Sequence, residues 1–216
     1  MGYRSPAQPL KGDRVKKIIA AIVGVVVLAG AGIGLWIVLE TASPVATVGK
    51  EKVSATDVNN SIKEILAERK GVATTGMQLA KGNDLTMSEV NFHLISYLLA
   101  DTASANGISV SAADVAARRA NIVTQVGGEA KLPQALVAAN IAQKDFPLYL
   151  KTLLFDEGLA KQVMKQGVAQ ANAGQAIQAL VTAEAKKVGI TVNSKYGKWD
   201  PAQAAVVANT AAPASK

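Results

Sequence analysis

The chain contains no cysteine and only one histidine, His93, among its 216 residues. The lack of cysteine excludes disulfide bonds, thiol catalysis, zinc ribbons and an anchor made from a lipid-modified cysteine. A single histidine also excludes catalysis by a histidine pair and a histidine-rich metal site. The one adjacent acidic pair, Asp156 and Glu157, diverges by about 100° on a helix, so it makes no converging acid–base pair. Because nucleophile motifs, phosphate-binding loops and metal-ligand spacings are also absent, the sequence predicts no enzyme, no cofactor and no metal.

Aromatic residues make up only 4% of the chain and charged residues 18%, whereas hydrophobic residues make up 50%. This hydrophobic content is too high for a mostly disordered chain, and the length predicts one domain with appendages. The formal net charge is +7. No basic run with interleaved aromatic residues accompanies that charge, so nucleic acid is not expected as a partner.

Charge is missing altogether from the run between Ile18 and Leu39. As a helix, this 22-residue run would measure roughly 30 Å, enough to cross the hydrocarbon core of a membrane. The preceding residues 1–17 carry five basic side chains and one acidic side chain, and such positive flanks stay in the cytoplasm. The sequence therefore predicts a single-pass protein of the cell membrane. It would have a cytoplasmic tail over residues 1–17, a transmembrane helix over residues 18–39 and an extracytoplasmic C-terminal part.

A cleaved secretion signal is the alternative explanation of this run. Signal peptides have a shorter apolar core and end at a small-x-small cleavage site. Here Thr41 and Ser43 would occupy the key positions, and Pro44 would directly follow the cut. The retained anchor is therefore favoured.

Within the run, Gly30 and Gly34 form a GxxxG motif. Small residues four apart let two membrane helices pack closely, so the motif favours a homodimer. The alternative is that glycine is simply common in membrane helices.

Hydrophobic residues recur at helical spacing after the apolar run, which predicts an all-α exported domain of five to six helices over residues 40–200. Cap motifs mark some ends, such as Ser111-x-x-Asp114 at a start and Asn106-Gly107 at an end. The expected helices cover residues 55–69, about 86–106, about 111–127, about 130–140, 143–166 and 170–188. One or two short strands are expected at residues 45–48 and 190–192.

Alanine and proline dominate residues 201–216, and this composition predicts a disordered tail. Just before the tail, Tyr196 and Trp199 lie close together. Two aromatic residues this near a chain end indicate a segment that docks on the helical body.

The order of several short motifs resembles one family. Residues 45–57 follow the pattern hydrophobic-x-hydrophobic-Gly-x-x-hydrophobic-Ser/Thr-x-x-Asp. A Gly-Ile-Ser-Val-Ser connector at residues 107–111, a glycine pair at 127–128 and a helix start near Asp145 come later. This order resembles the N-terminal chaperone domain of SurA/PrsA-type exported foldases, which is also similar to the peptide-binding part of trigger factor. Residues 189–200 look like the ending of single-domain SurA-like proteins of actinobacteria.

The resemblance implies a chaperone that binds unfolded or nascent exported polypeptides as they leave the membrane. Many members of the family carry a parvulin isomerase domain, for which this chain has no room, and parvulin sites use a histidine pair. Prolyl isomerase activity is therefore not expected. Related single-domain proteins often begin with a lipid-modified cysteine, and a transmembrane helix in contact with membrane lipid would serve the same tethering purpose here.

Flexible methionine and large aromatic side chains suit a surface that must adapt to varied chains. Eight such residues are the candidates for an apolar peptide-binding groove, and the alternative for each is ordinary core packing. They are Met77, Met87, Phe92, Tyr97, Phe146, Tyr149, Phe155 and Met164. His93 has no obvious partner in the sequence and is expected at the surface or at the boundary of the core.

A membrane-tethered adaptor is the alternative function. Its helical domain would bind one folded partner in the cell envelope, and the transmembrane helix would pair two copies through Gly30 and Gly34. A pull-down separates the two hypotheses, because an adaptor yields one stoichiometric partner and a chaperone yields many unfolded clients.

Overall fold

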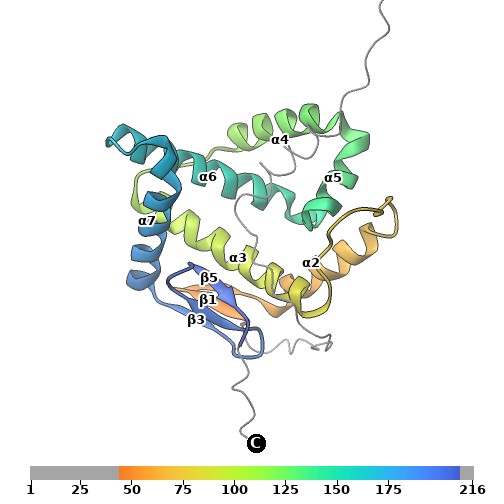
Figure 1. Cartoon of the computed structure of the whole chain (residues 1–216), viewed down its shortest axis with the longest axis horizontal. Coiled ribbons are helices and arrows are strands. Elements are labelled where there is room, and N and C mark those ends of the chain that lie inside the picture. Colours follow the sequence, from red (N-terminus) through yellow and green to blue (C-terminus); the bar gives the residue numbers. More distant parts are fainter. Residues whose placement is uncertain (1–43, 210–216) are drawn as a thin grey trace, which may run out of the picture.

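The computed structural model describes residues 44–209 (Figure 1). Within this range the chain forms six α-helices, three 3-10 turns and five strands of three residues each, which confirms the mostly helical class. The helices are α2 (Ala55–Glu68), α3 (Gly82–Ala105), α4 (Ala112–Val126), α5 (Leu132–Ala139), α6 (Phe146–Lys165) and α7 (Ala173–Val188). The 3-10 turns are η1 (Glu129–Lys131), η2 (Gln143–Asp145) and η3 (Gln170–Asn172).

Part of the prediction falls outside these residues. The cytoplasmic tail, the transmembrane helix over residues 18–39 with Gly30 and Gly34, and residues 210–216 are not among those described. Between residues 44 and 209, no helix combines the length and the apolar character that crossing a membrane requires.

Side-chain caps begin α2 and α4, and the cap of α4 lies at the residues that the sequence predicted. Ser54 Oγ accepts a hydrogen bond of 3.0 Å from the backbone N–H of Asp57 at the start of α2. At the start of α4, the N–H of Asp114 donates to Ser111 Oγ at 3.1 Å and the N–H of Ser111 donates to Asp114 Oδ2 at 2.9 Å. This reciprocal pair is a capping box, and it satisfies N–H groups that have no partner within the helix.

Two small antiparallel sheets complete the domain. β1 (Ala46–Val48) lies between β2 (Glu51–Val53) and β3 (Ile190–Val192), so one sheet joins the segments before α2 and after α7. Thr47 pairs with Thr191, and their hydroxyl oxygens are 2.6 Å apart. β4 (Lys198–Asp200) and β5 (Ala205–Val207) form a hairpin. The one or two predicted strands are thus too few, because strands of three residues are too short to show an alternating pattern.

The hairpin corrects the prediction of a disordered tail for residues 201–209. Ala205 and Val206 are buried, and the N–H of Val206 donates a hydrogen bond of 3.0 Å to the side-chain oxygen of Asn91 on α3. Pairing with β4 and burial of two apolar residues outweigh the alanine-rich composition from which disorder was predicted. The docking expected for Tyr196 is confirmed, since its side chain is buried in the core.

Helix α3 runs through the centre of the domain and contacts α2, α6, α7, β1 and β5 (Figure 1). It begins at Gly82, before the predicted start at Thr86, and the Thr86 hydroxyl donates to the Gly82 carbonyl within the helix. Half of its 24 residues are buried. Its buried positions include five polar side chains: Glu89, Asn91, His93, Ser96 and Thr102.

The apolar core has two main parts. The first cluster packs the sheet against α2, α3, α6 and α7, and the second cluster lies between α3, α4, α5 and α6. The fully buried members of the second cluster are Ile122, Leu132, Leu136, Ile141, Phe146, Tyr149 and Leu150. Figure 1 shows α4 and α5 at the end of the domain away from the sheet.

The close approach of α6 to the α3–α4 connector yields a first prediction. A Cβ at Gly158 would lie 2.7 Å from Cγ2 of Ile108, and a β-branched side chain cannot easily turn away. Gly158→Ala should therefore lower the free energy of unfolding by about 1–3 kcal/mol, as overpacking does, measured by urea unfolding.

Gly174→Ala is the matched control, because Gly174 also lies in a helix and its Cβ would meet nothing within 4 Å. It should leave stability unchanged or raise it by about 0.5–1 kcal/mol. Equal effects of the two substitutions would contradict the packing of α6 against Ile108.

Candidate functional site

The structure brings three of the eight predicted groove residues together. Phe146 and Tyr149 are buried in the second cluster, and the half-buried Phe92 packs against it. Tyr97 packs against the first cluster instead. The four aromatic residues thus belong to two separate parts of the core.

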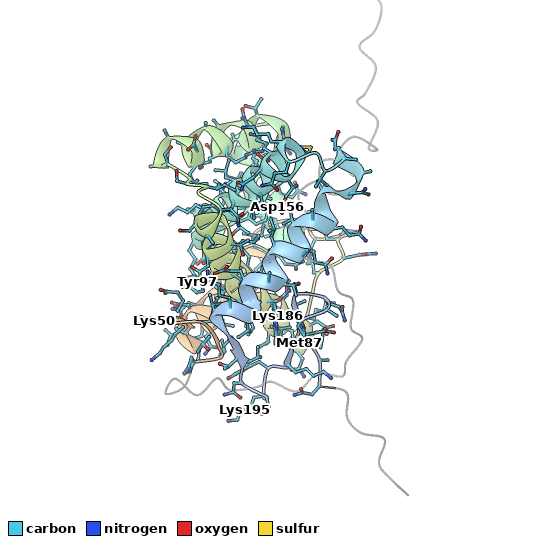
Figure 2. The ribbon with its side chains drawn as sticks, turned by 90° about the vertical axis from the view of Figure 1, so that its left-hand side faces the viewer. Lys50, Met87, Tyr97, Asp156, Lys186 and Lys195 are labelled. Carbon is cyan, nitrogen blue, oxygen red and sulfur yellow. The ribbon has the colours of Figure 1, made fainter. Side chains whose placement is uncertain are left out.

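The other four predicted residues lie apart from both clusters. Met77, Met87 and Phe155 are half-buried, and Met164, which is 38% exposed, is the one large hydrophobic side chain classed as exposed within residues 44–209. In Figure 2, Met87 and Tyr97 lie to the two sides of α7. The eight residues do not share one patch, and their part in peptide binding stays a prediction.

A further set of apolar residues lies along α4. Among its residues only Ile122 is buried, while Val115, Val123 and Val126 pack against the second cluster and are partly buried. We call these four residues the α4 stripe. Outside the stripe, Arg118 pairs with Glu157 on α6. The α4 stripe therefore covers the second cluster only partly.

A shallow hollow also lies between α7 and the segment that follows β4. Its walls are glutamine, alanine, threonine, lysine and proline side chains, among them Gln178, Lys186 and Pro201. None of the eight predicted residues lines it. It does not resemble an apolar groove.

Four buried polar side chains meet where α2, α3 and η2 come together. They are Ser61, Glu89, His93 and Asp145, and we call them the polar junction; each is at most 7% exposed. Ser61 Oγ donates to Asp145 Oδ2 at 2.6 Å and lies 3.2 Å from His93 Nε2. One side-chain ligand atom from each of Glu89, His93 and Asp145 lies within 4.8 Å of the others.

The prediction that His93 lies at the surface or at the boundary of the core is wrong, since it is 5% exposed and faces Ser61 on α2. The sequence did contain a signal, because Glu89 precedes His93 by four residues and such pairs share a helix face. Asp145 could not be linked to them in the same way. It reaches the junction because η2 turns the chain into α6.

Burial sets the protonation states at the junction. It raises the pKa of Glu89 to about 8, with a further rise from Asp145, while Lys144 and Arg69 oppose the shift. Burial also lowers the pKa of His93. At neutral pH the Glu89 carboxyl therefore keeps its proton and the imidazole is uncharged.

Backbone and side-chain contacts hold η2 against α2. Glu64 Oε1 accepts a hydrogen bond of 2.9 Å from the N–H of Lys144, and Glu68 Oε1 accepts one of 3.0 Å from the N–H of Gln143. The Lys144 ammonium lies 2.8 Å from Asp145 Oδ1. Because these N–H groups lie at the entry to α6, the two carboxylates act as caps supplied by another helix.

The arrangement limits what chemistry the junction can do. Ser61 is 0% exposed, so no substrate can reach its hydroxyl and acyl transfer is not supported. A neutral imidazole and two carboxyl groups can instead share protons or hold a cation.

A family model for the SurA-like N-terminal domain matches residues 11–154, about two thirds of the chain. The chain belongs to this family. The match includes all four residues of the polar junction and the whole α4 stripe. Searches of the curated proteins and of the solved structures found no match. The resemblance derived from the sequence motifs is thereby confirmed, and the SurA-like domain is a chaperone-type module.

The raised pKa of Glu89 yields a prediction for stability. Its value in the folded SurA-like domain is about 8 and its ordinary value is 4.5. Between these two pH values the folded protein therefore holds a proton on Glu89 that the unfolded chain has released. The stabilisation that comes from this proton is complete below about pH 4.5 and is lost as the pH rises through about 8. The lowered pKa of His93 acts in the opposite direction, but only up to about pH 6.5, its ordinary value.

Between about pH 6.5 and 8, the free energy of unfolding should fall by up to about 1.4 kcal/mol per pH unit. Urea unfolding in metal-free buffer measures this slope. Glu89→Gln should flatten it, whereas Glu51→Gln, at an exposed glutamate on β2, should not. The same slope in the wild type and in Glu89→Gln would contradict the protonation of Glu89.

Proposed function

We propose that this SurA-like domain is a membrane-anchored chaperone that binds unfolded segments of exported polypeptides along the α4 stripe and the adjoining second cluster. The observation that carries the proposal is that three of the four apolar residues of the α4 stripe are only partly buried against the second cluster. Family membership supports it, because SurA-like domains bind unfolded polypeptides in general.

The packing of α4 supports reversible binding. Only one residue of α4 is buried, and its other three contacts with the second cluster come from partly buried valines, so we expect α4 to open at a lower free-energy cost than helices with more buried residues. Movement of α4 would widen access to Phe92, Phe146 and Tyr149, which lie in or against the second cluster. These three predicted residues would then contribute aromatic surface beneath a bound chain.

The first test measures the aggregation of an unfolded client protein in the presence of the full chain held in lipid nanodiscs. The double variant Val115→Ser and Val126→Ser makes the α4 stripe more polar and should weaken suppression of aggregation several-fold. The control is Val72→Ser with Val110→Ser, since both valines are half-buried and belong to neither main cluster. Each variant costs about 1–2 kcal/mol of stability, so the comparison separates binding from unfolding.

Equal suppression by the two double variants would reject the α4 stripe as the binding surface. No suppression by the wild-type chain would reject the chaperone proposal itself. Capture of one folded partner in fixed stoichiometry would support the adaptor in its place. The proposal also includes the absence of isomerase activity, and acceleration of proline isomerisation in a peptide by the same preparation would contradict that part.

The membrane location is a separate part of the proposal. The family match begins at residue 11, so it includes the uncharged run over residues 18–39. The basic residues before this run support an N-terminus in the cytoplasm and a SurA-like domain on the extracytoplasmic side.

Protease added to intact spheroplasts should digest the SurA-like domain and leave an N-terminal epitope protected. Replacing Lys16 and Lys17 by glutamate should reduce the fraction in this orientation, because the positive flank sets the topology. Release of the domain into the medium would reject the anchor, and a domain protected in intact spheroplasts would reject the orientation.

A further inference from the structure

Glu89 differs from the other buried polar residues of α3. It is only 3% exposed, and the hydrogen bonds that link Ser61 to His93 and Asp145 do not include its carboxyl group. Burying a carboxyl group is costly unless its charge is neutralised or compensated by a partner. One ligand atom each of Glu89, His93 and Asp145 lies within 4.8 Å of the others, so a cation between them would be a partner common to all three.

We propose that Glu89, His93 and Asp145 bind one divalent transition-metal ion, represented by Zn²⁺, at the polar junction. Nothing in the proposed chaperone function requires this ion, so the two proposals stand or fall separately.

The spacing of the three side chains suits such an ion. Glu89 and His93 are four residues apart on α3, so the helix presents two ligands on one face. Ligand atoms around a tetrahedral Zn²⁺ are about 3.3 Å apart, given bonds of about 2.0–2.1 Å. The three ligand atoms here lie within 4.8 Å of one another, so they need to close by about 1 Å or somewhat more, which side-chain rotation can supply.

The donor types select the class of ion. One imidazole nitrogen with two carboxylate oxygens suits Zn²⁺ and its first-row neighbours. Mg²⁺ and Ca²⁺ prefer oxygen ligands alone, in larger numbers, and the junction offers too few. The lack of cysteine in the sequence excludes a thiolate site but not this one.

The surroundings supply the outer contacts that a metal site needs. Ser61 Oγ donates to Asp145 Oδ2, and the Lys144 ammonium lies 2.8 Å from Asp145 Oδ1. Such contacts orient a ligating carboxylate, and their loss typically lowers metal affinity 10–100-fold. The positive charge of Lys144 counts against a cation, so the inference rests on the geometry, in which three buried side chains place one ligand atom each within 4.8 Å of the others.

The burial of the junction gives the ion a structural role. Glu89 and His93 belong to α3, while Asp145 directly precedes α6. An ion bound by all three would fix the start of α6 to α3, and Asp145 is in turn bonded to Ser61 on α2. It would thus stabilise the position of the second cluster relative to the first without access to any substrate.

The test uses the full chain purified without a polyhistidine tag and stripped of metal by a chelator. Titration with Zn²⁺ should show one ion bound per chain and a rise in the thermal midpoint. His93→Gln and Glu89→Gln should each weaken binding by more than about 100-fold, because each removes a ligand. Asp101→Asn is the control, since Asp101 is a partly buried carboxyl on the same helix whose pKa burial also raises; it should change affinity less than about twofold.

A second measurement uses the wild-type chain, so it does not depend on whether the variants fold. His93 is the only histidine of the chain, so its imidazole nitrogen signals in an NMR spectrum have a single origin. Zn²⁺ should shift one of these signals as metal coordination does, and Mg²⁺ should not. Binding that leaves the His93 signals unchanged, or that survives in Glu89→Gln, would overturn the proposal, as would the absence of one-to-one binding. Each of these results would mean that protonation, without a bound metal ion, neutralises the carboxyl groups of the polar junction.

Discussion

The burial of α3 on nearly every side is the constraint on which the rest of the structure depends. A buried polar side chain on such a helix must find its partner in a neighbouring element, because an unpaired buried group is costly. Asn91 reaches the backbone of β5, His93 approaches Ser61 on α2, and Ser96 accepts a hydrogen bond from Thr152 on α6. Each contact fixes a different neighbour, so α3 sets the common position of the C-terminal hairpin, the first helix and the long helix α6.

The polar junction concentrates this effect at the entry to α6. The carboxylates of Glu64 and Glu68 accept hydrogen bonds from the backbone of η2. Asp145, in the same turn, is buried and accepts a hydrogen bond from Ser61 on α2. These contacts decide where α6 begins and thereby where Phe146 enters the second cluster. The second cluster thus contacts both the start of α6, which the junction positions, and the α4 stripe, which is proposed to bind unfolded segments.

Family membership and geometry support the same function by different routes. The family match establishes a chaperone-type module, and the partly buried α4 stripe is the surface on which we propose that a chain lies. Among the large hydrophobic residues of the described range 44–209, Met164 is the exposed one. Binding would therefore require α4 to move, which suits weak and reversible association with unfolded segments.

Local sequence by itself determined the helices, because periodicity and caps such as Ser54 and Ser111 act within a few residues of the chain. It also carried enough of the family pattern to indicate a SurA-like domain. Tertiary structure alone decided the pairing of β5, the burial of His93 and its meeting with Asp145, since each depends on a partner far away in the sequence. The prediction of disorder for residues 201–209 failed for the same reason. Contact with α3 orders these residues, and a prediction from local composition does not include that contact.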